Sequence, residues 1–180
     1  MTYTTPARLL HWIMAILILA MIAAGWVMVR DGLDRATQNA LFIFHKNTGV
    51  LLLIFAGIRL AYRWLRPPPP LPDHIPGWQA RLAGASHGVL YALLFAMPIA
   101  GYVRVKAGGF PIETLDTMGV PSLVVRSEAL ATIAKSIHYF GGLALCAVIA
   151  AHILAGFYHL IVRRDGVFSR IWPPVRPPMD

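Results

Sequence analysis

The chain has 180 residues, of which 57% are hydrophobic and only 13% charged, and its formal net charge is +8 at pH 7. This composition excludes an ordinary soluble domain, because the apolar residues gather into runs of the length that a membrane-spanning helix needs, about 20 residues. The positive charge does not indicate nucleic-acid binding, because the basic residues flank these runs. The single cysteine excludes a disulfide framework.

Four apolar runs predict an all-α fold, an integral membrane four-helix bundle that forms one domain over residues 1–180. Three of the runs, Leu9–Val29, Leu82–Val103 and Ser136–Val162, contain no Asp, Glu, Lys or Arg. The fourth contains three basic residues. The predicted helices span about 8–29, 40–65, 80–105 and 132–163.

The connections between these helices differ in character. The first helix is longer than the apolar core of a typical secretory signal and is followed by Arg30 and Asp31, so we expect it to remain in the protein. Four prolines at 67–70 end the second helix, because proline cannot continue a helix interior. Pro98 predicts a kink in the third helix. The longest loop, 106–131, is expected to hold a short interfacial segment at Leu115–Val125.

The distribution of basic residues predicts the orientation, since the cytoplasmic ends of membrane helices carry the excess of Lys and Arg. Seven basic residues fall at one end of the predicted bundle, together with five of the eight acidic residues. Nine fall at the other, which we call the inner end: Arg8, Arg59, Arg63, Arg66, Arg81, Arg163, Arg164, Arg170 and Arg176. Both termini are therefore expected in the cytoplasm.

Histidines within the predicted spans are the strongest functional signal, because such residues are costly in a membrane and usually functional. His138 and His152 are 14 residues apart, which places them within about 40° of one helix face and about 21 Å apart along the axis. Two imidazoles in this arrangement are suited to hold two haems stacked across the bilayer. Because there is no C-x-x-C-H motif, the haems would be b-type and bound non-covalently.

The depth of each histidine in the membrane predicts its partner. The first helix enters from the inner surface and the fourth returns to it, so His11 and His152 share the inner level. His45 opens the second helix and His138 opens the fourth, so these two share the outer level. The sequence therefore predicts two pairs of iron ligands, His11 with His152 and His45 with His138.

Other residues are expected to complete the haem sites. Arg59 follows His45 by 14 residues and would pair with the propionates of the inner haem. A porphyrin between helices needs positions without side chains. Gly49, four residues beyond His45, is such a position, and Gly25 and Gly101 are expected at the outer level.

Three residues near the inner pair are candidates for a quinone site: His87, His159 and Arg163. His87 is more consistent with a propionate or quinone contact than with an iron ligand. His159 lies on the face of His152, about 10 Å further toward the inner surface, where it would act as a proton relay or as an interfacial anchor. His74, in the proline-rich connection, is expected to be solvated.

Together these residues resemble the bacterial cytochrome b561 family over essentially the whole chain. The resemblance rests on His11-Trp12, His45 with Gly49, Arg59 before the prolines, Ser86-His87-Gly88, Pro98-Ile99-Ala100-Gly101, and the series His138, His152 and His159. It implies a dihaem cytochrome of the bacterial inner membrane with the same ligand pairs. It further implies electron exchange with ubiquinone and superoxide as the periplasmic electron donor.

The predicted function is the transfer of single electrons from an outer donor, through the outer and inner haems, to a quinone. Lys46, Arg104 and Lys106 are candidates to steer superoxide, a small anion, toward the outer haem. The alternative is that they are ordinary interfacial anchors. Lys46 directly follows His45, an expected iron ligand, and a lysine at this position departs from the family pattern.

Two other classes of function remain open. One is a cytochrome b subunit of a larger membrane dehydrogenase or hydrogenase complex, for which the loop 106–131 would be the docking surface. The other is a haem-transport protein, which would need an open coordination position. Four histidines matched in depth argue against the second class.

Overall fold

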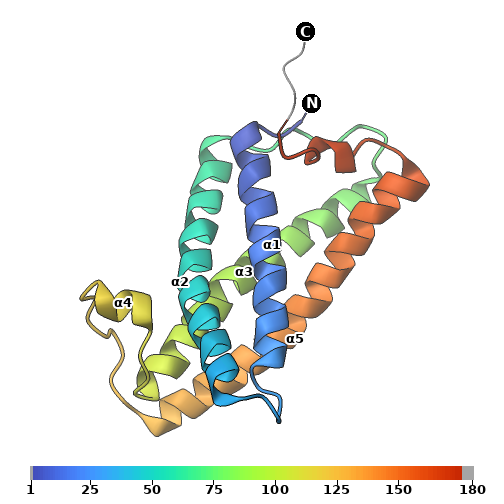
Figure 1. Ribbon diagram of the computed structural model, residues 1–180. Helices are drawn as coiled ribbons and strands as arrows, with labels where there is room; N and C mark the ends of the chain where they lie inside the picture. The colour runs from blue at the N-terminus through green and yellow to red at the C-terminus, as the bar shows by residue number, and fades with distance from the viewer. Residues whose placement is uncertain (1, 176–180) are drawn as a thin grey trace.

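The computed structural model describes residues 2–175, so Arg176 of the inner-end charges lies outside the described part. The structure is a helical bundle (Figure 1). Four of its helices are long and apolar enough to span a membrane. The last of these four spans consists of α5 and the π-helix η1 that continues it. The elements are α1 (Thr5–Val27), α2 (Arg35–Leu65), α3 (Gly77–Ala107), α4 (Glu113–Thr117), α5 (Glu128–Phe157), η1 (Tyr158–Arg163) and a 3-10 helix, η2 (Phe168–Arg170).

The long helices pack as two pairs. Helix α1 packs along α2 and α3 packs along α5, and α2 joins the pairs through α3. Within residues 2–175, α1 and α5 form no extended interface. Small side chains allow the close approaches between membrane helices, and five of the buried residues are alanines: Ala24, Ala56, Ala100, Ala107 and Ala134. These alanines let the paired helices pack closely, whereas α1 and α5 lie opposite each other without an extended interface among the described residues.

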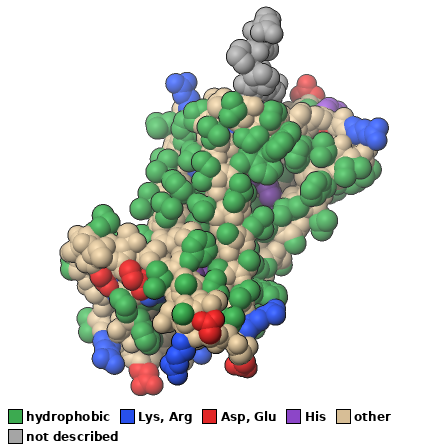
Figure 2. All heavy atoms as spheres, viewed as in Figure 1, with side chains coloured by type: hydrophobic (Ala, Val, Ile, Leu, Met, Phe, Trp, Pro, Cys, Tyr) green, Lys and Arg blue, Asp and Glu red, His purple; other side chains and the backbone are tan. Residues whose placement is uncertain are grey.

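The outward surface of the bundle is apolar along its length. Ile16, Phe140 and Leu154 are each about two-thirds exposed, at 65%, 66% and 68%. Figure 2 shows hydrophobic side chains covering the sides of the molecule, with the charged side chains gathered toward its two ends. This distribution fits a hydrocarbon environment around the middle of the bundle and polar surroundings at each end.

All four long helices begin three to five residues earlier than the hydropathy of the sequence predicts, because their first turns are less apolar than the spans that follow. Helix α2 begins at Arg35 instead of about 40, since the Asp34 carboxylate caps it by accepting from Thr37 N at 2.9 Å. Helix α5 begins at Glu128 instead of about 132, with Ser127 as its cap. Helix α1 begins at Thr5, with Pro6 in its first turn.

The outer connection between α3 and α5 also differs from expectation. Helix α3 includes Pro98 and ends at Ala107, two residues beyond the predicted end. The short helix α4 begins two residues before the predicted Leu115–Val125 segment, because Asp116 Oδ2 accepts from Ile112 N at 3.1 Å and stabilises the first turn. Gly119, at a φ of 69°, follows α4 and reverses the chain. Figure 1 shows α4 beside the bundle at the end opposite to the start of α1.

The segment after α5 folds back beneath the inner end of the bundle. Arg164 adopts the left-handed conformation, with a φ of 49°, directly after η1. Trp12 Nε1 donates to Ile171 O at 3.0 Å, and Arg8 Nη1 donates to Pro173 O at 2.8 Å. These two hydrogen bonds tie the segment to α1.

Candidate functional site

Two pairs of histidines face each other across the space between the helix pairs. At the inner level His11 of α1 and His152 of α5 have ring centres 6.2 Å apart. At the outer level His45 of α2 and His138 of α5 have ring centres 6.0 Å apart. In Figure 2 a histidine side chain is visible in a hollow on this face. Helix α5 thus supplies one member of each pair.

The spacing of both pairs fits one metal ion held between two imidazoles. An imidazole nitrogen binds a metal at about 2.0–2.1 Å, and the ring centre lies about 1 Å behind it, so opposed rings are centred about 6 Å apart. Among residues 2–175 no group of three or more His, Cys, Asp or Glu is placed to hold a metal ion. Two protein ligands at a site suit a haem iron, whose remaining ligands come from the porphyrin.

Glycines allow neighbouring helices to approach the outer pair. A Cβ atom at Gly25 would lie 3.1 Å from His45 Cε1, and one at Gly101 would lie 3.2 Å from His138 Cε1. Both positions therefore have little room for a side chain. Gly49 lies elsewhere, because its nearest neighbour outside its own helix is the methyl group of Met21, and its contact with a haem stays a prediction.

The Nδ1 atoms of the two outer histidines, His138 and His45, have different environments. His138 Nδ1 lies 3.0 Å from Met97 O. Because a carbonyl oxygen only accepts, this bond places the proton on Nδ1 and leaves Nε2 in the form that binds a metal. His45 Nδ1 is buried without a hydrogen-bond partner among the described residues. Such a group is costly unless a ligand or water reaches the imidazole.

A cation and a third histidine lie beside the inner pair. Arg59 Nη1 donates to Ala7 O at 3.2 Å, and Arg59 Nη2 lies 3.3 Å from His11 Nδ1. The guanidinium is therefore close enough to serve a propionate at this level. The ring of His87 is centred 5.5 Å from that of His152. The structure thus brings His87 to the inner pair, on the side contributed by α3.

Two of the three candidate steering cations are engaged by acidic residues of α4. Lys46 Nζ lies 2.6 Å from Glu113 Oε1, and Asn47 Nδ2 donates to Glu113 Oε2 at 3.1 Å. Lys106 forms an ion pair with Asp116. We refer to Lys46, Asn47 and Glu113 as the outer clasp. Sequence reasoning missed it, although Glu113 and Asp116 are the only acids between residues 106 and 126.

Both carboxylates of α4 are charged at neutral pH. Burial is the largest single influence on the pKa of Glu113 and raises it, but the hydrogen bonds from Lys46, Asn47 and the backbone, together with the charge of Lys46, hold the pKa below its usual value. The hydrogen bond from Lys106 lowers the pKa of Asp116 in the same way. These charges compensate those of the two lysines. Arg104, in contrast, forms no ion pair within the described residues.

The remaining candidates, His159 and Arg163, meet at a carboxylate that sequence reasoning did not select. His159 Nδ1 lies 2.6 Å from Asp165 Oδ2, and Arg163 Nε lies 3.9 Å from the same atom. The Asp165 side chain is only 5% exposed. Burial is the largest single influence on the pKa of Asp165 and raises it, but the hydrogen bonds with His159 and the Val167 backbone, together with the nearby histidine charges, lower the pKa overall. Both His159 and Arg163 lie in the π-helix η1, a type of helix that often occurs at functional sites.

Comparison with known proteins agrees with this architecture. The sequence matches the family described as "Prokaryotic cytochrome b561" over residues 2–174. It is 31% identical over 172 residues to "Cytochrome b561 homolog 2" of Escherichia coli (strain K12), covering 94% of this chain and 90% of the relative. It is 28% identical over 171 residues to "Cytochrome b561 homolog 1" of the same organism, covering 91% and 93%.

A third relative carries a more specific name. "Probable superoxide oxidase CybB" of Yersinia pestis is 26% identical over 167 residues, covering 93% of each chain. The four-span fold, the paired histidines and these matches define a haem-binding membrane protein of electron transfer. The chain belongs to the prokaryotic cytochrome b561 family, which confirms the resemblance seen in the sequence.

Proposed function

We propose that the protein binds two b haems and carries electrons from superoxide on the periplasmic side to ubiquinone near the cytoplasmic side of the bacterial inner membrane. The observation that carries this proposal is the pair of histidine sites, with ring centres 6.0 and 6.2 Å apart and both sharing α5. Both chain termini lie in the cytoplasm in this proposal, so the inner end faces the cytoplasm.

Each proposed haem has a defined set of protein partners. His11 and His152 hold the inner haem, with Arg59 as the partner of a propionate, and His45 and His138 hold the outer haem. When bound, a haem supplies reversible one-electron chemistry. Because two histidines would hold each haem, the residues present would leave no open ligand position for oxygen and would favour electron transfer.

The overall reaction balances with two donors for each acceptor. Two superoxide anions each lose one electron and become two molecules of dioxygen, while one ubiquinone takes up two electrons and two protons and becomes ubiquinol. The donor side must attract a small anion. Since Lys46 and Lys106 are compensated by α4, we assign the larger part of this attraction to Arg104. The relative named as a probable superoxide oxidase supports this choice of donor.

The acceptor side must deliver protons to the reduced quinone. His87 lies beside the inner pair, and His159 is hydrogen-bonded to Asp165 near the chain reversal at Arg164. An imidazole paired with a carboxylate can pass a proton inward and be reprotonated from outside. In this role Asp165 fixes the ring of His159, while Arg163 is available to the quinone oxygens.

The test uses the detergent-purified holoprotein. Haem content per chain and the dithionite-reduced spectrum are measured first, and then superoxide is supplied with and without ubiquinone. We expect two low-spin b haems that superoxide reduces and ubiquinone reoxidises. One haem for each chain would refute the ligand pairs, and two haems that ignore superoxide would refute the donor.

A second candidate function is a cytochrome b subunit of a larger dehydrogenase or hydrogenase complex. It is favoured by apolar side chains that the outer loop exposes, among them Met118 (71%), Leu123 (82%) and Val125 (84%). A partner protein would cover such a surface. Isolation of the protein from its native membrane with a stoichiometric iron–sulfur partner would favour this function over the first.

A further inference from the structure

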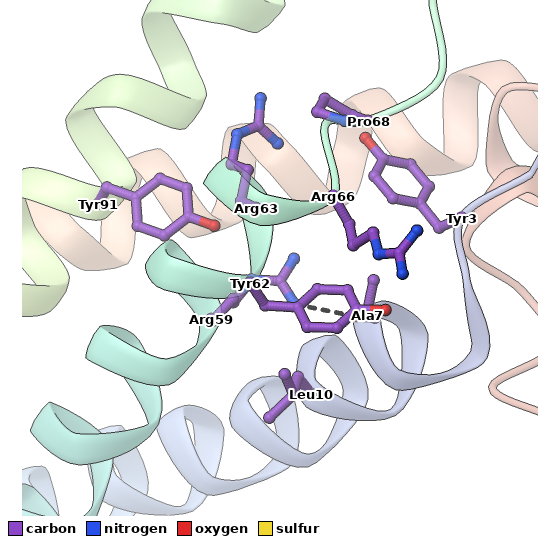
Figure 3. Close-up of a pocket in the computed structure, with 9 residues that line it drawn as sticks. All are labelled: Tyr3, Ala7, Leu10, Arg59, Tyr62, Arg63, Arg66, Pro68 and Tyr91. Carbon is purple, nitrogen blue, oxygen red and sulfur yellow. Dashed lines mark hydrogen bonds between the residues drawn. The ribbon is translucent and has the colours of Figure 1, made fainter.

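Arginines and tyrosines line a depression at the inner end of the bundle (Figure 3). It lies between α1, α2 and α3 and is shallow, with a volume of about 20 Å³. Its three arginines are Arg59 and Arg63, which lie on one face of α2 because they are four residues apart, and Arg66, which directly follows the last residue of α2. Three tyrosines also line it: Tyr3, Tyr62 and Tyr91.

The depression contains cations without anions. Within residues 2–175 none of its three arginines forms an ion pair with a carboxylate. Arg59 is directed to Ala7 and His11 of α1. The side chains of Arg63 and Arg66 donate no hydrogen bond to another described residue. Their full donor capacity is therefore available to a ligand.

Two buried arginines adjoin the same region and add to its positive charge. Arg8 is 2% exposed and Arg170 is 7% exposed, and the Nε atom of each lacks a partner among the described residues. The Arg170 guanidinium lies 5.8 Å from the ring centre of Tyr3, which lines the depression. Because buried cations are costly without a counter-charge, this end of the bundle favours a bound anion.

The surroundings indicate that the anion comes from the membrane. Trp64 and Leu65, which lie between the arginines in the sequence, are 74% and 79% exposed. They are large apolar side chains at the end of a spanning helix, where lipid chains and headgroups meet. An acyl chain can therefore pack along them while its headgroup reaches Arg63 and Arg66.

We propose that the depression binds the phosphate group of an acidic phospholipid such as phosphatidylglycerol. Arginine recognises phosphate through paired N–H donors, and basic pockets between membrane helices suit anionic headgroups. Tyr3 and Tyr91 provide hydroxyl groups at the rim. The depression shares Arg59 with the proposed inner haem site, but its proposed phosphate contacts come from Arg63 and Arg66, so either proposal can fail alone.

The experiment compares the holoprotein with Arg66→Gln and with the double variant Arg63→Gln, Arg66→Gln. Arg81→Gln is the matched control, because Arg81 is an exposed arginine of the inner end that does not line the depression. Co-purified lipid is identified by native mass spectrometry. Thermal unfolding is followed in nanodiscs of phosphatidylcholine with and without phosphatidylglycerol, and haem content is measured for every variant.

For the wild type and the control we expect retained phosphatidylglycerol and a melting temperature raised by about 4 °C for each tenfold excess of lipid over its Kd. The double variant should lose both effects, Arg66→Gln should weaken them, and haem content should stay the same. Unchanged lipid retention in the double variant would overturn the proposal. Loss of haem instead of lipid would also overturn it, because the depression would then serve the haem propionates.

Discussion

The Nζ atom of Lys46 lies 2.6 Å from Oε1 of Glu113, so the residue next to His45 is tied to the short helix of the outer loop. Lys46 Nζ also donates to Pro111 O at 2.8 Å. The outer clasp therefore fixes α4 beside the outer histidine pair. It also determines how much positive charge remains free on the side where the donor is proposed to arrive.

Removal of the acid from the clasp should increase the attraction for superoxide. In Glu113→Gln the charge of Lys46 is no longer compensated, so we expect superoxide to reduce the haems roughly threefold faster at low ionic strength, with a steeper fall as salt is added. Stopped-flow absorbance at several salt concentrations measures this. Glu128→Gln removes an acid outside the clasp and should behave like the wild type. Equal salt dependence in all three proteins would contradict steering.

The pH dependence of the clasp follows from the lowered pKa of Glu113. A carboxyl whose pKa is lower in the folded state stabilises the fold fully above its ordinary pKa, and this stability is lost as the pH falls through the lowered value. We therefore expect residues 111–118 to stay protected from hydrogen exchange at neutral pH and to open only below about pH 4. Glu113→Gln measured at each pH is the control. Opening of the wild type already near pH 6 would be incompatible with this ion pair.

The histidine pairs predict a distinct haem loss for each substitution. His45→Ala should lose the outer haem and His11→Ala the inner one, so haem content falls by about half in each. His87→Ala should retain both haems. Pyridine haemochromogen assays give the content, and redox titration shows which potential disappears. A His87→Ala protein that loses the inner haem while His11→Ala keeps it would reassign the partner of His152.

Two glycines of α3 provide a matched test of the outer site. Gly101→Ala places a Cβ 3.2 Å from His138 Cε1, whereas a Cβ at Gly88 meets nothing within 4 Å. Because alanine favours a helix over glycine by about 1 kcal/mol, Gly88→Ala should be neutral or stabilising. Gly101→Ala should displace the imidazole and alter the low-spin resonance of the outer haem. Identical electron paramagnetic resonance spectra for both variants would show that Gly101 does not constrain the site.

Asp165 predicts an effect on the acceptor side alone. In Asp165→Asn a neutral amide replaces the carboxylate that is hydrogen-bonded to His159. We therefore expect the reoxidation of the haems by ubiquinone to slow roughly tenfold and the pH dependence of this rate to change. Reduction by superoxide should keep its rate. Asp165→Glu restores a carboxylate and should recover part of the activity. A uniform loss at every pH, together with a lower melting temperature, would indicate that Asp165 only stabilises the turn.

Much of the arrangement could be predicted from the sequence because membrane depth restricts it strongly. Four apolar runs define the spans, and the alternating direction of the helices brings His11 to the level of His152 and His45 to that of His138. A 14-residue spacing on one helix is sufficient to place His138 and His152 on one face. These inferences need only helix geometry and the thickness of a bilayer.

The polar contacts at the two ends could not be predicted in the same way. The bond of Lys46 to Glu113 spans 67 residues and depends on how the outer loop folds. The bond of Trp12 to Ile171 spans 159 residues. Hydropathy also misses capped first turns such as that of α2 at Asp34. The start of a helix there depends on one side-chain hydrogen bond and not on an apolar pattern.

Helix α5 contributes one histidine to each pair, so the positions of both pairs depend on one helix. The distance between the proposed haems is set by the 14-residue spacing of His138 and His152 along α5. A change in the packing of α1 against α2 would not alter this spacing. A single residue inserted between the two histidines would turn one ligand by about 100° around the helix axis and remove it from its partner. In the proposed function, the length of the electron path between the two haems is therefore fixed by covalent structure.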